Sequence, residues 1–114
     1  MIDVCRYFFD VSTTIIDGMS HFQFNTLHFH LTEDHGWRLD LKKFPNLVKM
    51  WARDELNGIP YGPYSFSEDD AREIVEYARI RSIRVIPEIE MPGHALGLLC
   101  GYPQYSCNGG PFKP

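Results

Sequence analysis

Residues 26–45 read TLHFHLTEDHGWRLDLKKFP and place an alternating strand directly before a loop of charged groups. Apolar and polar side chains alternate strictly over the first six residues of this segment. One face carries Leu27, Phe29 and Leu31, and the other carries His28 and His30. Two imidazoles followed by acids predict a strand whose polar face lines a pocket. From this segment alone, a strand with a solvated face and a charged turn remains the alternative.

A second segment has the same organisation. Residues 85–94 read VIPEIEMPGH, an apolar strand that ends in acids and is followed by a histidine. Two such strand ends in one short chain favour a functional site. The candidate residues at or just beyond the carboxyl ends of predicted strands are Arg6, His30, Glu33, Asp34, Glu88, Glu90 and His94.

The composition is typical of one soluble globular domain, with 44% hydrophobic and 23% charged residues in 114. A formal net charge of -4 provides no basic field, so we expect no nucleic-acid partner. No apolar run approaches the roughly 20 residues of a membrane span, and no basic-then-apolar leader precedes Ile2. Three cysteines are too few for a disulfide scaffold; Cys100 and Cys107 either pair across a loop or stay free.

Strands and helices alternate along the chain. The expected strands are residues 1–6, 26–31, 83–89 and a short one within 37–41, and the expected helices are residues 10–22, one beginning at Ser67 and one at 95–99. Ser67 and Asp70 form a capping-box pattern before an apolar stripe of Ala71, Ile74, Val75 and Ala78. Residues 57–64, NGIPYGPY, read as a loop.

Strands that alternate with helices predict a parallel α/β sheet. Helices would cover the apolar faces, and the polar faces would turn to the other side. In a closed barrel that side is the lumen, and active sites lie at the carboxyl ends of the strands. A (β/α)8 TIM barrel needs at least about 200 residues. We therefore expect a partial barrel of about the first three βα units, with residues 1–114 as one incomplete domain.

Several motifs together resemble a known family. They are DVCRYF at 3–8, HFHLTEDHGWRLDLKKFPNL at 28–47 and EIVEYARIRSIRVIPEIEMPGHALGLL at 73–99. In this order and approximate spacing they resemble the catalytic domain of family 20 glycoside hydrolases, the exo-acting β-N-acetylhexosaminidases. The tail YPQYSCNGGPF at 102–112 looks like the bacterial branch. The resemblance covers nearly the whole chain and implies a (β/α)8 barrel.

The resemblance also implies roles for individual residues. Arg6 matches the arginine that binds hydroxyls of the terminal sugar, a task suited to its fixed, charged donors. Glu33 and Asp34 match an acidic pair in the active-site network. Glu90 and His94 match the acid and histidine around a Pro-Gly turn, where the histidine orients and tunes the general acid.

For the two strand histidines and the tryptophan the resemblance is less specific. We expect His30 to line the substrate pocket and His28 to pack in the lumen. Trp37 is expected to be a core aromatic.

The implied reaction is substrate-assisted and retaining, an exception to the two-carboxylate mechanism. The substrate's acetamido oxygen attacks the anomeric carbon, while a consecutive Asp-Glu pair orients that group and protonates the leaving oxygen. No residue of these 114 is assigned to that pair; Asp54-Glu55 follows no apolar strand. Implied substrates are N-acetylglucosamine- or N-acetylgalactosamine-terminated glycans, with no cofactor and no metal. A secreted, periplasmic or lysosomal-like location is expected from the family.

Two other functions remain open. One is a metal-dependent barrel hydrolase in which the His28-x-His30 pair, with His94 and Glu90, binds zinc. The other is a non-catalytic or degenerate sugar-binding remnant, because the Asp-Glu pair is missing from these residues. Because these residues would form only part of a barrel, the rest of the barrel is expected to be needed for folding, and the isolated chain is expected to be inactive.

Overall fold

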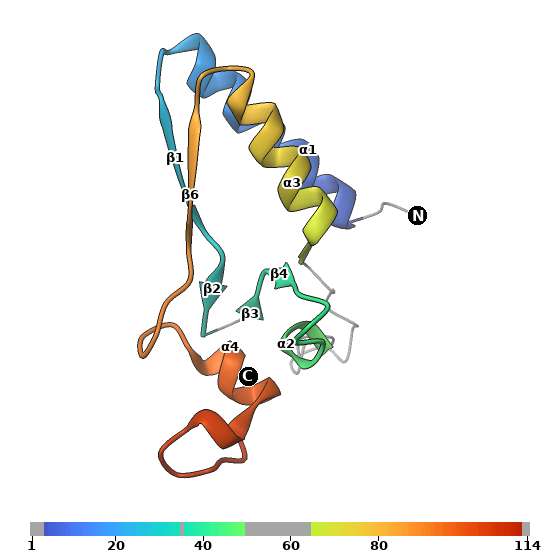
Figure 1. The fold of residues 1–114 in the computed structure, drawn as a ribbon, viewed down its shortest axis with the longest axis vertical. Coiled ribbons are helices and arrows are strands. Elements are labelled where there is room, and N and C mark those ends of the chain that lie inside the picture. Colours follow the sequence, from blue (N-terminus) through green and yellow to red (C-terminus); the bar gives the residue numbers. More distant parts are fainter. Residues whose placement is uncertain (1–3, 35, 50–64, 113–114) are drawn as a thin grey trace.

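The computed structural model describes residues 4–34, 36–49 and 65–112. They form an elongated body of 46 × 35 × 24 Å (Figure 1). The elements in chain order are α1 (Val4–His21), β1 (Thr26–His30), β2 (Thr32–Glu33), β3 (Gly36–Trp37), β4 (Leu39–Asp40), α2 (Asn46–Lys49), β5 (Phe66–Ser67), α3 (Glu68–Arg79), β6 (Arg84–Glu88), α4 (Leu96–Gly101) and the 3-10 helix η1 (Pro103–Tyr105). Helices α1 and α3 lie beside the long strands, and α2 and α4 lie near their carboxyl ends (Figure 1).

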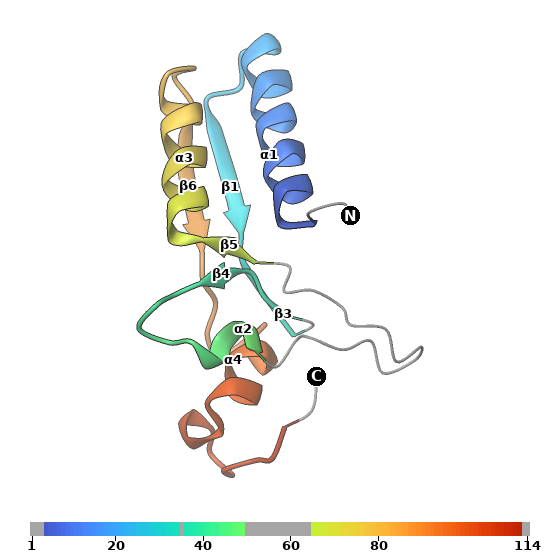
Figure 2. The same cartoon turned by 90° about the vertical axis from the view of Figure 1, so that its right-hand side faces the viewer.

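The two long strands, β1 and β6, pair in parallel with His30 opposite Glu88. Helices α1 and α3 cover one face of this pair (Figure 2). The core between helices and strands consists of Phe9, Ile16, Leu31, Phe66, Ile74, Ala78 and Ile83. Leu27 and Phe29 pack against this core, as their alternation with the histidines predicted. The parallel α/β arrangement is thus confirmed for these two strands.

Helix α3 begins with the predicted capping box. The Ser67 hydroxyl accepts a hydrogen bond from the Asp70 amide at 3.1 Å, and the Asp70 carboxylate accepts one from the Ser67 amide at 2.8 Å. These bonds satisfy two amide groups that have no partner within the helix. Of the predicted apolar stripe, Ile74 and Ala78 are fully buried, whereas Val75 is half exposed.

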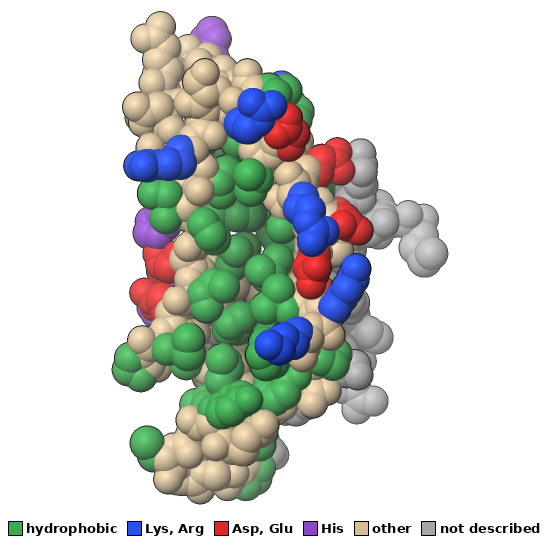
Figure 3. Space-filling view, in the orientation of Figure 1, with side chains coloured by type: hydrophobic (Ala, Val, Ile, Leu, Met, Phe, Trp, Pro, Cys, Tyr) green, Lys and Arg blue, Asp and Glu red, His purple; other side chains and the backbone are tan. Residues whose placement is uncertain are grey.

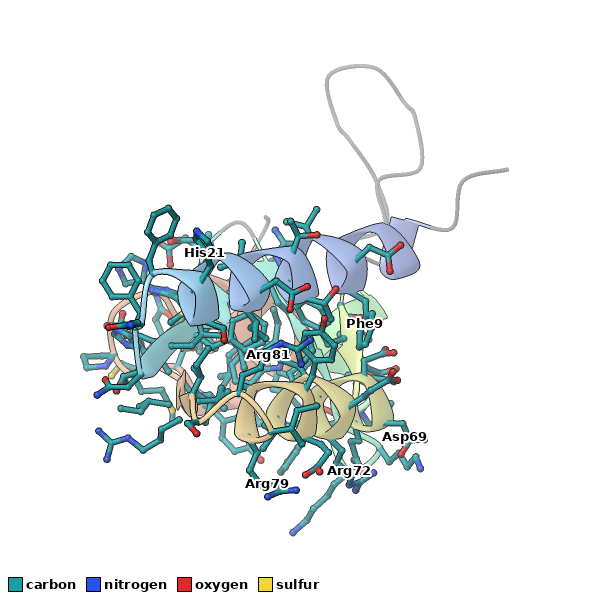
Figure 4. All side chains as sticks on the ribbon, turned by 90° about the horizontal axis from the view of Figure 1, so that it is seen from above. Phe9, His21, Asp69, Arg72, Arg79 and Arg81 are labelled. Atoms are coloured by element: carbon teal, nitrogen blue, oxygen red, sulfur yellow. The ribbon has the colours of Figure 1, made fainter. Side chains whose placement is uncertain are left out.

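Helices α1 and α3 are joined by a polar contact at the end near the β1 amino terminus. The Tyr77 hydroxyl lies 2.9 Å from both carboxylate oxygens of Asp17, and Arg81 Nε lies 2.7 Å from Asp17 Oδ1. The Arg81 guanidinium also stacks over the Tyr77 ring, 3.5 Å from its centroid. Figure 4 shows Arg81 lying between the two helices. This contact supplements the apolar packing that holds α1 against α3.

We predicted a strand at residues 1–6, and this prediction is wrong for residues 4–6, because α1 already begins at Val4. A helix satisfies its backbone hydrogen bonds within its own segment, whereas a strand needs a neighbour. The helix expected at residues 10–22 accordingly starts six residues earlier and ends at His21. The described residues thus contain two of the three expected long strands.

The described part of the connection between β1 and α3 contains short elements. The strand expected within 37–41 is divided: β3 pairs with β2 in antiparallel fashion, and β4 pairs with β5 in parallel. The predicted loop at 57–64 and the Asp54-Glu55 pair lie outside the described residues. Cys100 is buried and Cys107 is exposed, and both are free thiols.

Apolar side chains remain exposed around this body. Figure 3 shows a band of hydrophobic side chains between the strand pair and the charged residues of α3. Beyond the strand ends, an apolar groove of about 410 Å³ has Trp37, Phe44, Met91 and Tyr102 among its lining residues. Within the described ranges, none of the helices has the length and apolar character that a membrane span requires.

Candidate active site

The polar faces of β1 and β6 meet at Glu88. Its Oε1 lies 3.1 Å from His30 Nδ1, and its Oε2 contacts His28 Nε2. Both histidines project from the face opposite the helices, because alternate side chains of a strand point to opposite sides. The His28 side chain is 65% exposed, the His30 side chain 43%, and the Glu88 side chain 20%. Glu88, which the sequence marked only as a strand-end acid, therefore links the two imidazoles.

A second histidine centre lies just beyond the strands. His94 Nδ1 is 2.8 Å from Glu33 Oε1, and His94 Nε2 is 3.4 Å from Glu90 Oε2. The His94 ring stands edge-to-face against the His30 ring with centroids 5.3 Å apart. His94 also adopts a left-handed backbone conformation with φ of 47°, which costs roughly 1–2 kcal/mol in a non-glycine residue. The family resemblance indicated a Pro-Gly turn before His94, at Pro92 and Gly93; the left-handed backbone conformation is at His94 itself.

The charges of His94 and Glu33 stabilise one another. The hydrogen bond with Glu33 raises the pKa of His94 above its ordinary value of 6.5, and the Glu33 charge adds to this effect. The same hydrogen bond, with a further one from the Asp34 amide, lowers the pKa of Glu33 below 4.5. Each group thus favours the charged form of its partner.

The acidic pair of residues 33 and 34 is divided between two tasks. Glu33 binds His94, whereas Asp34 Oδ1 accepts a hydrogen bond from the Leu96 amide at 3.2 Å. Leu96 is the first residue of α4, whose amides have no helical partner at this end. Asp34 therefore anchors α4 beside the site, while Glu33 faces the histidines.

This cluster of histidines and acids at the carboxyl ends of parallel strands is the arrangement expected for a barrel active site. Comparison with known proteins agrees. The profile of the glycosyl hydrolase family 20 catalytic domain matches residues 1–113. The chain belongs to this family.

Its relatives in the family include named enzymes. A β-hexosaminidase of Porphyromonas gingivalis is 46% identical over 117 residues, which cover all of this chain and 15% of the relative. One of Akkermansia muciniphila is 39% identical over 113 residues, covering 94% of this chain and 22% of the relative. The chain thus spans about a fifth or less of these relatives' length.

Solved structures of the family share the fold. The β-N-acetylhexosaminidase of Bacteroides fragilis superposes with a TM-score of 0.78 at 37% identity, covering 92% of this chain and 21% of that one. The Streptomyces plicatus N-acetyl-β-hexosaminidase in complex with Thio-NAglucal gives 0.77 at 35% identity, covering 93% and 20%. The α/β architecture is therefore that of a family 20 barrel fragment.

Most site residues predicted from the family resemblance come together. Glu33, Glu90 and His94 form one connected group, and His30 contacts it through the His94 ring. Asp34 adjoins the group but binds α4. The side chain of Arg6 lies outside what the structure describes, so its role in sugar binding stays a prediction.

One organising residue was not predicted. Thr32 is 1% exposed, and its hydroxyl accepts a hydrogen bond from the Glu90 amide at 3.0 Å. Its carbonyl oxygen lies 2.5 Å from His30 Nε2. Threonine is a common strand residue, so neither its type nor its position before Glu33 indicated a link to a segment 58 residues later.

The cluster also meets the minimum requirement for holding a cation. Two overlapping groups, His30 with Glu33 and His94, and His30 with Glu88 and Glu90, have ligand atoms within 4.8 Å of one another. His28 belongs to neither group and contacts Glu88 instead. The His28-x-His30 pair that prompted the metal-hydrolase alternative therefore does not supply two ligands to one centre among the described residues.

Proposed function

We propose that this chain is the N-terminal part of the catalytic barrel of an exo-acting β-N-acetylhexosaminidase. The enzyme would remove terminal non-reducing N-acetylhexosamine residues from glycans by a substrate-assisted, retaining reaction. Family membership and the names of the relatives support the activity. The observation that carries the proposal in this chain is the Glu33–His94–Glu90 group beside His30 and Glu88 at the strand ends.

In this reaction the nucleophile belongs to the substrate. The acetamido oxygen attacks the anomeric carbon and forms an oxazolinium-type intermediate, and water then opens it with overall retention. The Asp-Glu pair that orients the acetamido group and protonates the leaving oxygen would follow a later strand of the whole barrel. This chain would supply sugar recognition and the electrostatic surroundings of the acid.

His94 would act on the general acid through its charge and position. Glu33 holds Nδ1 and favours the imidazolium form, and Glu90 lies on the other side of the ring. A cation fixed in this way lowers the pKa of a neighbouring glutamic acid and fixes its orientation. His94 is therefore a positioning residue in this proposal.

The sugar would contact the exposed side of the same cluster. His30 is partly exposed and tied to Glu88 and the Thr32 carbonyl, so its ring is held in one orientation at the pocket wall. Arg6 would bind sugar hydroxyls through its guanidinium. Together these groups would recognise the terminal ring and leave the scissile bond to the acid.

The proposal is tested by measuring aryl release from aryl β-N-acetylglucosaminide by the whole protein, with and without EDTA. Activity that survives EDTA is the expected result, because no step uses a metal. Activity abolished by EDTA and restored by zinc would favour the metal-dependent hydrolase. A folded whole protein that binds N-acetylglucosamine without releasing the aryl group would favour the non-catalytic alternative.

A further inference from the structure

We propose that His30, Glu33 and His94 form an inhibitory binding site for zinc or a similar transition-metal ion. The ligand atoms of these three side chains lie within 4.8 Å of one another. Two imidazoles and a carboxylate are a ligand set that Zn²⁺ accepts, with water as the fourth ligand. Nothing in the proposed hydrolysis requires such an ion.

The geometry requires only small adjustments. Ligand atoms bound to a tetrahedral zinc ion lie roughly 3.4 Å apart. Glu33 Oε1 and His94 Nδ1 are already 2.8 Å apart. The side chains of His30, Glu33 and His94 are 43%, 42% and 45% exposed, so an ion can reach them. For the ion to bind, the His30 ring would exchange one of its two oxygen partners, Glu88 or the Thr32 carbonyl, for it.

The groups behind the ligands fit a metal site as well. A zinc-bound histidine normally donates its other ring N–H to a carboxylate or a backbone carbonyl. If the ion replaces the proton between His94 Nδ1 and Glu33, His94 Nε2 still faces Glu90 Oε2 at 3.4 Å. The two ring nitrogens of His30 face Glu88 Oε1 at 3.1 Å and the Thr32 carbonyl at 2.5 Å. Whichever nitrogen of His30 binds the ion, the other keeps an oxygen partner.

The local charge also favours a cation. Glu88 and Glu90 adjoin the three ligands and form with His30 the second group of possible ligands. Three carboxylates around two imidazoles concentrate negative charge at an exposed surface. Because the same side chains form the proposed sugar site, a bound ion would exclude the sugar; this consequence rests on the proposed function.

The test is calorimetric titration of the whole protein with zinc chloride. We expect one zinc ion per chain, and a loss of affinity of more than about tenfold in both His30→Gln and His94→Gln, since even outer partners of a zinc ligand contribute that much. His21→Gln is the matched control, because His21 is the last residue of α1 (Figure 4) and shortly precedes the amino terminus of β1, whereas the site lies at and beyond the carboxyl end of that strand. Circular dichroism checks that each variant is folded. If either His30→Gln or His94→Gln fails to fold, the other variant alone provides the test.

The outcomes separate the metal site from the proposed function. Absence of stoichiometric zinc binding, or equal binding by the wild type and both site variants, overturns the metal site. Zinc binding that is lost in both site variants and kept in His21→Gln supports it. Weaker zinc binding in the presence of N-acetylglucosamine supports both proposals. Zinc binding at the site that is indifferent to the sugar supports the metal site and counts against the sugar site placed there.

Discussion

The buried hydroxyl of Thr32 accepts a hydrogen bond from the backbone amide of Glu90 at 3.0 Å. This bond joins the segment after β1 to the segment after β6, and each of these segments supplies acids to the candidate site. The Thr32 carbonyl also meets the His30 ring. Thr32 thus fixes the position of Glu90 relative to His30, although its own side chain is buried.

Thr32→Val removes the hydroxyl and keeps the shape of the side chain. We expect it to lower the free energy of unfolding of the whole protein by about 1–3 kcal/mol, because the Glu90 amide loses its acceptor. kcat/KM should fall, and the alkaline limb of its pH profile should shift as Glu90 and His94 move. Thr32→Ser, which keeps the hydroxyl, should retain the wild-type profile. Unfolding in denaturant measures the change in stability, and pH–rate profiles measure the change in kcat/KM. A Thr32→Val variant with wild-type stability and a wild-type profile would contradict the prediction.

The Glu33–His94 pair should make stability depend on pH. The raised pKa of His94 provides stability that is complete below 6.5 and is lost as the pH rises through its folded value. The lowered pKa of Glu33 provides stability that is complete above 4.5 and is lost as the pH falls through its folded value. The difference in Tm between the wild type and Glu33→Gln should therefore be largest between about pH 4.5 and 6.5. A difference that is constant over pH 3 to 9 would show that the pair does not form.

His94→Ala should act on the reaction more than on substrate affinity. Loss of the imidazolium removes a charge that would tune the general acid, so we expect kcat to fall, but by less than the roughly 10²–10⁴-fold contributed by a residue that transfers the proton itself. The alkaline limb of the pH profile, where the general acid loses its proton, should also move. His21→Ala is the control and should behave as the wild type. A fall in kcat/KM that is due entirely to KM would assign His94 to sugar binding instead.

The capping box of α3 offers a test of the fold that does not involve the site. Ser67→Ala should lower the free energy of unfolding by about 0.5–2 kcal/mol, since the Asp70 amide loses its acceptor. Ser20→Ala, at an exposed position of α1, should have no measurable cost. Equal stability of the two variants in denaturant would mean that the cap does not form in solution.

The parts of the structure that could be predicted from sequence are those determined by local patterns. The alternation at Leu27 and Phe29 identified β1 and its buried face. Ser67 and Asp70 marked the start of α3. The histidines and acids after each strand could be placed together because parallel strands end at the same edge of a sheet.

The remaining features depend on contacts between distant segments. Residues 4–6 read as a strand, but without a described neighbouring strand they are helical. The link from Thr32 to Glu90 spans 58 residues, and no local pattern encodes it. The division of tasks between Glu33 and Asp34 depends on where α4 begins. The left-handed backbone conformation of His94 could not be predicted either, because the sequence indicated a turn at the preceding residues, Pro92 and Gly93.

The most direct test of the central claim compares substrates that differ only at carbon 2. The whole protein is assayed on aryl β-N-acetylglucosaminide, its N-trifluoroacetyl analogue and aryl β-glucoside. We expect kcat/KM to fall sharply with fluorination, which weakens the acetamido oxygen as a nucleophile. For the glucoside, which has no internal nucleophile, kcat/KM should be at least about a hundredfold lower than for the N-acetylglucosaminide. Equal hydrolysis of all three substrates would contradict substrate assistance, and with it the role proposed here for this cluster.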